Sequence, residues 1–217
     1  MMRKAVIFDL DGVITDTARY HFLAWKHMAN QIGIDIDEKF NETLKGVDRM
    51  GSLERILALS KKHYSDNEKH ALADQKNEYY KELIKGMTAK DLLPGAASAL
   101  KSLKEMGVKT GLASVSKNAG TILDRLGISH CFDYVVDANL ISKGKPDPEI
   151  FLTAAKELDT DPKDCVGVED AVVGIQAIKS AGMYAIGVGD KSVLNQADRV
   201  IPDLNSMPLG EAFKAIP

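Results

Sequence analysis

Carboxylate side chains follow two of the short apolar runs in this sequence. Asp9 and Asp11 come shortly after one run, and Glu169 and Asp170 come directly after another. Clustered carboxylates repel one another, and several oxygen ligands at one point suit a hard cation such as Mg²⁺. The carboxylates therefore predict a metal site, provided that the fold brings the two runs together.

Small polar and cationic side chains follow two further apolar runs. Ser114, Ser116, Lys117 and Asn118 come after one run, and Lys145 ends the loop after the next. A lysine and hydroxyl groups suit a phosphoryl group, whose oxygens need positive charge and hydrogen-bond donors. Because Mg²⁺ commonly shares its coordination shell with a substrate phosphate, the two sets of residues together indicate phosphoryl transfer.

The motifs of other phosphate-binding folds are absent from the sequence. A Walker A loop ending at Gly144-Lys145 would need Gly where Asn139 stands, and a dinucleotide fingerprint would need Gly where Ser192 stands. The segment from Asp9 also fails as an EF-hand loop, because its glycine comes too early. An aspartate can itself act as the nucleophile and form an aspartyl-phosphate.

Each polar group also has a structural interpretation. The Asp9–Gly12 segment could be a turn whose aspartates accept backbone hydrogen bonds. Glu169 and Asp170 could complement the dipole of a following helix, and the segment 114–116 could cap another. The occurrence of all these groups after successive apolar runs favours a functional site over three separate structural roles.

Six apolar, β-rich runs position these residues. The runs are Ala5–Phe8, Thr110–Ala113, Tyr134–Val136, Cys165–Val168, Tyr184–Val188 and a weaker Arg199–Ile201. The later runs are separated by helical patterns at Lys117–Leu126, Pro148–Leu158 and Ala171–Ala181. This alternation predicts the α/β class, with a Rossmann-like parallel sheet covered on both faces. Ligands of such sheets bind beyond the carboxyl ends of the strands, where all the polar groups above would meet.

The segment between the first two runs has no convincing strand pattern. Apolar residues from Ala18 to Ile32 follow the spacing of an amphipathic helix, and residues 52–62 and 67–85 also show helical patterns. A helical block after the first strand of an α/β sheet predicts an inserted, small, all-helical domain. We expect this domain at residues 16–91 and the α/β core domain at residues 1–15 and 92–217.

The composition of the 217-residue chain excludes several classes of protein. Apolar residues make up 45% and charged residues 27%, as in soluble globular proteins. The net charge of −3 leaves no basic excess for a nucleic-acid partner. No apolar run is long enough for a secretory signal or a membrane helix, and Cys131 and Cys165 form no C-x-x-C pair. We expect a cytoplasmic monomer that binds small molecules and has no membrane partner.

The four motifs together resemble those of the haloacid dehalogenase-like superfamily. Asp9-Leu10-Asp11-Gly12 is similar to its first motif, Ser114 to its second, Lys145-Pro146 to its third and Glu169-Asp170 to its fourth. The resemblance covers nearly the whole chain, and the helical insertion is similar to the small cap domain of that superfamily. It implies that Asp9 is the phosphoryl-carrying nucleophile and that Asp11 is the general acid and base. It also implies that Ser114 and Lys145 bind the transferring phosphoryl group, and that Mg²⁺ is held by Asp9, the Asp11 backbone carbonyl, Glu169 and Asp170.

A second set of residues lies in the helical segment: His21, Trp25, Leu44-Lys45-Gly46-Val47, Arg49, Ser52 and Lys76-Asn77. Within the superfamily, these residues resemble those of sugar-phosphate mutases. The resemblance implies interconversion of β-D-glucose 1-phosphate and D-glucose 6-phosphate through β-glucose 1,6-bisphosphate as activator and intermediate. It implies that the distal phosphate is held by Arg49, Ser116, Lys117 and Asn118. It implies further that the sugar is positioned by Thr17, His21, Lys45 and Lys76, with substrate contacts from Trp25, Leu44, Gly46, Val47 and Ser52. The sequence departs from this pattern at Asp48, whose negative charge would weaken a nearby phosphate contact.

Three alternative functions share parts of this pattern. A sugar-phosphate phosphatase of the same superfamily would have the same core residues and would differ in letting water reach the aspartyl-phosphate. A non-catalytic phosphosugar sensor would need no nucleophile, so the Asp9 and Asp11 pair argues against it. A dehalogenase would not need the acidic residues Glu169 and Asp170.

Overall fold

The computed structural model describes residues 4–44, 47 and 49–206, and the chain divides into two compact units. The sheet unit consists of Met1–Asp16 and Met87–Pro217, and the helical unit consists of Thr17–Gly86. We expected the boundaries at residues 15–16 and 91–92. The residues just before Leu92 stay with the sheet unit because Thr15 Oγ1 donates a hydrogen bond to the Asp91 carbonyl (2.7 Å) and Thr15 forms a β-bridge with Leu92.

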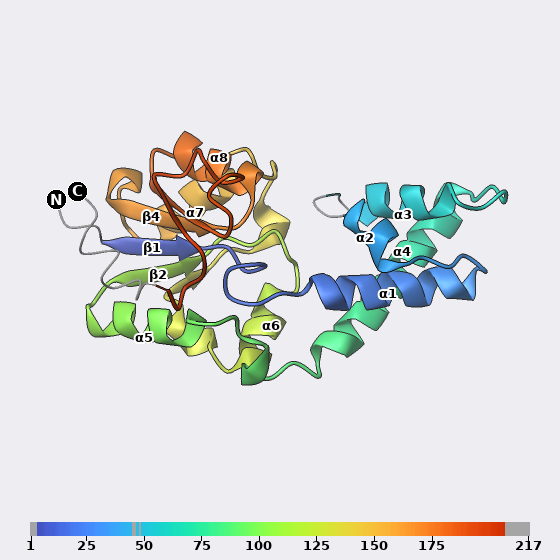
Figure 1. Cartoon of the computed structure of the whole chain (residues 1–217), viewed down its shortest axis with the longest axis horizontal. Helices are drawn as coiled ribbons and strands as arrows, with labels where there is room; N and C mark the ends of the chain where they lie inside the picture. Colours follow the sequence, from blue (N-terminus) through green and yellow to red (C-terminus); the bar gives the residue numbers. More distant parts are fainter. Residues whose placement is uncertain (1–3, 45–46, 48, 207–217) are drawn as a thin grey trace. The chain divides into compact units, whose positions relative to one another are not determined.

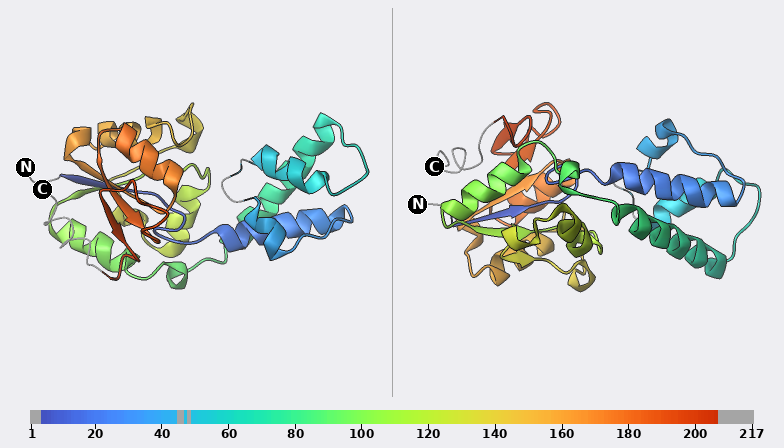
Figure 2. Two further views of the ribbon diagram at one scale, coloured as in Figure 1. Left: turned by 45° about the horizontal axis from the view of Figure 1, so that its top comes forward. Right: turned by 90° about the horizontal axis from the view of Figure 1, so that it is seen from below.

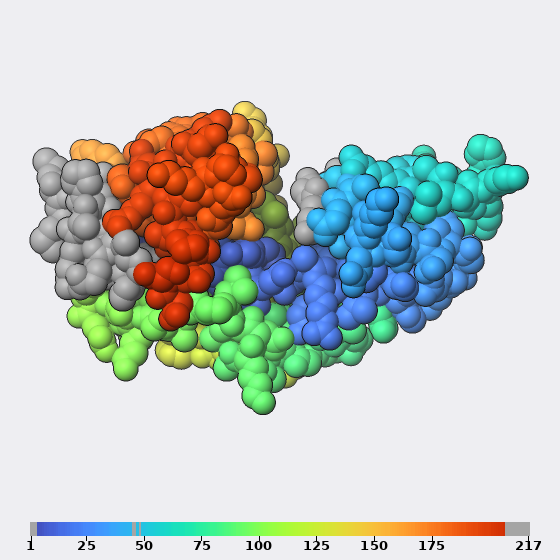
Figure 3. Space-filling model, in the orientation of Figure 1, coloured from blue at the N-terminus to red at the C-terminus, as the bar shows by residue number. Residues whose placement is uncertain are grey.

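The sheet unit contains a six-stranded parallel sheet with strand order β3-β2-β1-β4-β5-β6 (Figure 1), which confirms the predicted fold class. The strands are β1 (Ala5–Phe8), β2 (Lys109–Leu112), β3 (Tyr134–Val135), β4 (Cys165–Glu169), β5 (Tyr184–Val188) and β6 (Arg199–Ile201). Phe8 lies opposite both Leu112 and Val168, so the carboxyl ends of the three central strands lie at one level. In Figure 3 the segment that contains β6 (red) forms part of the outer surface of this unit.

Helices cover both faces of this sheet, as the fully buried central strands β1 and β4 require. They are α5 (Ala96–Glu105), α6 (Ala119–Leu126), α7 (Glu149–Glu157) and α8 (Val172–Ser180). The apolar faces of α7 and α8 share a core with Ala5 and Ile7 of β1, and Figure 1 shows α5 on the opposite side of the strands. Single-turn 3₁₀ helices lie in the connections: η1 (Ala89–Asp91), η2 (Ser129–Cys131), η3 (Ala138–Leu140) and η4 (Pro162–Asp164).

Within its described residues, the helical unit contains four α-helices, of which α1 and α4 lie side by side (Figure 2). The helices are α1 (Ala18–Gln31), α2 (Glu38–Glu42), α3 (Arg49–Leu57) and α4 (Asp66–Ile84). Their apolar residues form a separate core that includes Trp25, Met28 and Ile56. Ser65 and Glu68 form a capping box that starts α4, because each side chain bonds the backbone N–H of the other. Across the described residues, we find no helix with the length and apolar character that a membrane span requires.

Candidate active site

Asp9 is held at the carboxyl end of the central strand. Its backbone N–H donates to the Val168 carbonyl of β4 (2.9 Å), and the Ala113 N–H donates to the Phe8 carbonyl (2.7 Å). These bonds extend the ladder by one residue on both sides of β1. Asp9 is therefore buried between the chain segments that carry Ser114 and Glu169, two of the predicted site residues.

Lys145 links two of the predicted carboxylates. Its Nζ atom donates to Glu169 Oε2 at 2.8 Å and to Asp9 Oδ1, and it lies 5.1 Å from the centre of the Phe151 ring. Only 9% of the Lys145 side chain is exposed. Burial acts to lower the pKa of Lys145, but the charges of Asp9 and Glu169 outweigh it and raise this pKa above its usual value. Lys145 therefore stays charged next to Asp9.

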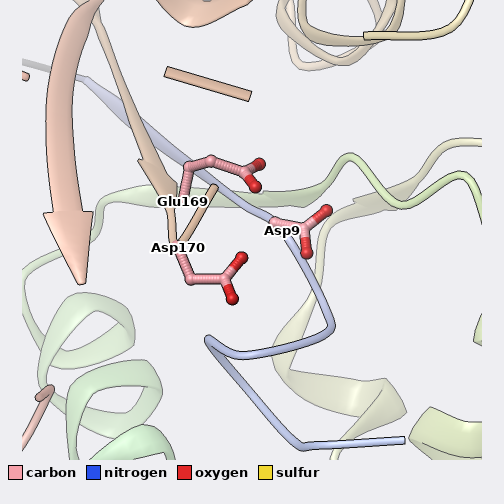
Figure 4. A group of neighbouring side chains, drawn as sticks. All are labelled: Asp9, Glu169 and Asp170. Atoms are coloured by element: carbon pink, nitrogen blue, oxygen red, sulfur yellow. The ribbon is translucent and has the colours of Figure 1, made fainter. Parts of the chain in front are cut away.

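Three carboxylates converge beside this lysine. Asp9, Glu169 and Asp170 each offer an oxygen, and these oxygens lie within 4.8 Å of one another (Figure 4). Burial and the charge of Asp9 raise the pKa values of Glu169 and Asp170. One lysine does not neutralise three carboxylates, and hard oxygen donors suit a divalent cation. The donor set fits a metal ion, as the sequence predicted.

The turn after β1 passes directly against one of these carboxylates. Gly12 has a φ angle of +77°, and a Cβ atom placed on it would lie 1.9 Å from Asp170 Oδ2. A side chain at position 12 would therefore both strain the backbone and displace Asp170. The glycine allows the turn, which contains Asp11, to pack against the acidic group.

The loop after β2 presents the predicted phosphate-binding residues. Ser114 is buried, and its Oγ accepts a hydrogen bond from the Ser116 N–H (3.1 Å). Ser116 Oγ in turn accepts a bond from the Asn118 N–H (3.3 Å), while Lys117 is exposed. These bonds order a short polar loop in front of α6. Its hydroxyls and the lysine lie at the carboxyl edge of the sheet, as predicted.

In the helical unit, buried Lys76 and half-buried His21 form a polar pair. Lys76 Nζ lies 2.8 Å from His21 Nδ1, and Lys76 is only 3% exposed. Burial and the charges of Lys76 and Arg49 lower the pKa of His21 to about 3, so the neutral imidazole accepts a hydrogen bond from the lysine. Burial and Arg49 also lower the pKa of Lys76 to about 7. The pair thus carries positive charge that no carboxylate among the described residues neutralises through an ion pair.

The other predicted residues of the helical unit have different surroundings. Trp25 belongs to the apolar core, with Lys76 Nζ 4.8 Å from its ring centre. Arg49 is exposed and donates to Asn77 Oδ1 (3.0 Å), and buried Ser52 donates to the Val47 carbonyl (3.3 Å). The remaining described positions are Thr17, buried at the start of α1, and Leu44, in the same core. Lys45, Gly46 and Asp48 lie outside the described residues.

The sequence did not predict two aromatic residues, Tyr80 and Phe151, whose rings contact Lys76 and Lys145. Tyr80 stacks on His21 with ring centres 4.2 Å apart and lies 4.9 Å from Lys76 Nζ, and Phe151 lies under Lys145. Tyr80 is four residues after Lys76 on α4, and this spacing was a usable signal because such residues share a helix face. Phe151 had no comparable signal.

Comparisons with known proteins agree with this geometry. The model of the haloacid dehalogenase-like hydrolase family matches residues 3–182. The β-phosphoglucomutase of Bacillus subtilis (strain 168) is 53% identical over 208 residues, which cover 95% of this chain and 92% of that protein. The fructose-1-phosphate phosphatase YqaB of Escherichia coli (strain K12) is 34% identical, with coverages of 84% and 95%. A crystal structure of β-phosphoglucomutase from Clostridium difficile superposes with a TM-score of 0.86 at 49% identity and covers 98% of each chain.

Proposed function

The chain belongs to the haloacid dehalogenase-like hydrolase family, and from this premise we propose that it is an isomerase with β-phosphoglucomutase activity. It interconverts β-D-glucose 1-phosphate and D-glucose 6-phosphate. The contact of Lys145 with both Asp9 and Glu169, beside Asp170, supports phosphoryl transfer, which a phosphatase would share. The observation that carries the mutase assignment is the 53% identity to a β-phosphoglucomutase over 95% of this chain. The relative with mutase activity is also more similar to this chain than the phosphatase relative is, at 53% against 34% identity.

Asp9 is the proposed nucleophile. One of its carboxylate oxygens attacks the phosphorus of β-glucose 1,6-bisphosphate, and the bond from phosphorus to the sugar oxygen breaks. Asp11 donates a proton to that sugar oxygen as it leaves. In the reverse direction Asp11 accepts the proton of a sugar hydroxyl, which attacks the aspartyl-phosphate and regenerates the bisphosphate. The sugar phosphate turns around between the two transfers, so one aspartate serves both positions.

Lys145 and Ser114 bind the oxygens of the phosphoryl group in transit. Lys145 is permanently charged and already held against Asp9, so it needs little reorganisation to meet those oxygens. Asp9, Glu169, Asp170 and the Asp11 backbone carbonyl are the proposed ligands of Mg²⁺. A bound Mg²⁺ would neutralise part of the negative charge that these carboxylates and the phosphoryl group bring together.

The helical unit is the proposed cap domain, which selects the substrate and excludes water. We assign the distal phosphate to Arg49, together with Ser116, Lys117 and Asn118 of the core. His21 and Lys76 have the positive charge and the donor that a phosphosugar needs. We assign them, with Thr17 and Lys45, to positioning the sugar.

The cysteines bear on the location of the protein. Cys131 and Cys165 are both free thiols. Because free thiols persist in reducing compartments, we propose a cytoplasmic location. Subcellular fractionation with an antibody against the chain tests it, and recovery from a secreted or membrane fraction would contradict it.

Product analysis tests the proposed function. The protein is incubated with β-glucose 1-phosphate, Mg²⁺ and a trace of β-glucose 1,6-bisphosphate. Stoichiometric glucose 6-phosphate is the expected result, and stoichiometric inorganic phosphate would identify a phosphatase instead. α-Glucose 1-phosphate in the same assay tests the anomer preference, and Asp9→Asn is the control without a nucleophile.

A further inference from the structure

The Glu169 side chain packs against Gly174, a residue of helix α8 that has no side chain. Gly174 lies in the first turns of α8, and a Cβ atom placed on it would lie 2.0 Å from Glu169 Cδ and 2.3 Å from Glu169 Oε2. Real Cβ contacts are much longer than this, so the Glu169 carboxylate occupies the volume of the missing methyl group. Its position depends on the absence of a side chain at residue 174.

The hydrogen bonds of Glu169 make any other position of its carboxylate energetically unfavourable. Oε1 accepts from the Ala171 N–H (3.3 Å) at the start of α8, and Oε2 accepts from Lys145 Nζ (2.8 Å). The side chain is 3% exposed. A displaced carboxylate would therefore lose a bond to Lys145 or to the helix start while it remained buried, which is unfavourable for a charged group.

The backbone of Gly174 does not itself require glycine. It lies inside α8 and is not among the glycines with positive φ. Alanine is favoured over glycine in a helix by up to about 1 kcal/mol, the full value applying to the interior rather than to the first turn, where Gly174 lies. Helix stability alone would thus prefer alanine, whereas the contact with Glu169 forbids it.

We propose that Gly174 is a positioning residue for the metal site, which sets the place of the Glu169 carboxylate relative to Asp9 and Lys145. The inference rests on the proposed function, because it assigns Glu169 as a metal ligand. Groups that orient metal ligands typically change metal affinity by about 10- to 100-fold when they are altered. We expect a weakening of that size in Gly174→Ala.

The test measures metal binding without turnover. Mn²⁺ titrations followed by electron paramagnetic resonance, with Mg²⁺ as competitor, give the affinity of the full chain for both ions. Gly174→Ala should retain the circular dichroism spectrum of the parent and bind both ions about 10- to 100-fold more weakly. Gly120→Ala is the matched control, because Gly120 also lies in a helix and a methyl group placed on it would have no neighbour within 4 Å.

A second variant separates displacement of Glu169 from general damage. Glu169→Asp shortens the side chain by one methylene and withdraws the carboxylate from residue 174. Introduced into the parent, Glu169→Asp should weaken metal binding. Introduced into Gly174→Ala, it should lower the metal affinity about fivefold less than in the parent, or not at all. If Gly174→Ala does not fold, the double variant should restore folding, and failure to do so overturns the proposal.

The remaining outcomes are also decisive. Parent-like metal affinity in Gly174→Ala, or strictly additive effects of the two substitutions, would overturn the role of Gly174 and leave the proposed function intact. Failure of the parent to bind either ion would instead overturn the metal site, and with it this part of the proposed function.

Discussion

Lys76 offers the sharpest test of the electrostatics of the helical unit. It is a buried cation surrounded by the rings of Trp25 and Tyr80 and by His21, with Arg49 as the nearby charge that acts on it. A buried charge without a partner of opposite sign destabilises a folded protein. We therefore expect Lys76→Met, which keeps an unbranched side chain of similar length, to stabilise the helical unit while it impairs substrate binding.

The size and pH dependence of this effect follow from the pKa of Lys76. Folding lowers it from 10.5 to about 7. Between these values the unfolded chain binds more protons than the folded chain, so the free energy of unfolding of the parent rises with pH. Each pH unit contributes at most about 1.4 kcal/mol, and the rise between pH 7 and pH 10 is about 3 kcal/mol. Methionine does not titrate, so Lys76→Met lacks this rise.

The variant should therefore be more stable than the parent at pH 7 by about 2 kcal/mol, after about 1 kcal/mol is lost with the hydrogen bond to His21. The difference should change by about 3 kcal/mol towards pH 10, so that the parent becomes the more stable protein there by about 1 kcal/mol. In the parent, the His21 pKa of about 3 keeps the imidazole neutral throughout this range. Lys76→Met removes the contribution of the Lys76 charge, but burial, which is the largest cause, and Arg49 still lower this pKa.

Trp25 supplies the assay. It is the one tryptophan in the sequence, it belongs to the core of the helical unit and it lies 4.8 Å from Lys76 Nζ. Its fluorescence during urea unfolding at pH 7 and pH 10 reports the stability of this unit directly. Lys81→Met on the same helix is the control, because Lys81 forms an exposed pair with Glu78 and should change stability by less than about 1 kcal/mol at either pH. A difference between Lys76→Met and the parent that does not change with pH would refute the reasoning.

Three further predictions concern catalysis and binding. Lys145→Met should lower kcat by about 10²- to 10³-fold in the mutase assay. Without Mg²⁺ it should also destabilise the sheet unit by about 3 kcal/mol in urea unfolding, because Asp9 and Glu169 lose their cation. Unchanged stability would contradict the role of Lys145 in compensating the two carboxylates. Arg49→Ala should raise the KM for β-glucose 1,6-bisphosphate about 10-fold or more but leave reaction with a small phosphoryl donor nearly unchanged, and equal losses in both assays would disprove its assignment to the distal phosphate. Asp9→Asn should abolish covalent labelling by a ³²P-labelled phosphoryl donor, and retained label in this variant would place the nucleophile elsewhere.

The sheet was largely predictable from the sequence because its strands are short, apolar and bounded by polar residues. Three of them, Ala5–Phe8, Tyr184–Val188 and Arg199–Ile201, have the bounds that the apolar runs predicted. Prediction was poorer in the helices. The pattern at residues 52–62 predicted a helix that in fact runs from Arg49 to Leu57, since the polar residues after position 59 have no apolar side chain to bury. Helices α2 and α5 were not identified at all.

The convergence of the site residues was predictable for a similar reason. Asp9 and Glu169 come at the ends of adjacent parallel strands, and the topology of the sheet places such residues at one edge. Their detailed contacts were not predictable. That Lys145 reaches both carboxylates, or that Gly174 leaves room for Glu169, depends on distances between atoms far apart in the sequence. The paired position of His21 and Lys76 likewise joins two helices that no local pattern relates.

The two buried lysines, Lys76 and Lys145, have opposite electrostatic surroundings. Lys145 has two carboxylates beside it, so its charge is retained and the local excess is negative, which favours a metal ion. Among the described residues, the neighbours of Lys76 are neutral rings, His21 and a nearby arginine, so the local excess of charge is positive and an anion would compensate it. A bound metal ion would compensate the first site, and an anionic group of the substrate would compensate the second. The uncompensated charge at each position lowers the folding stability of the free protein, and a ligand that compensates this charge recovers that free energy when it binds.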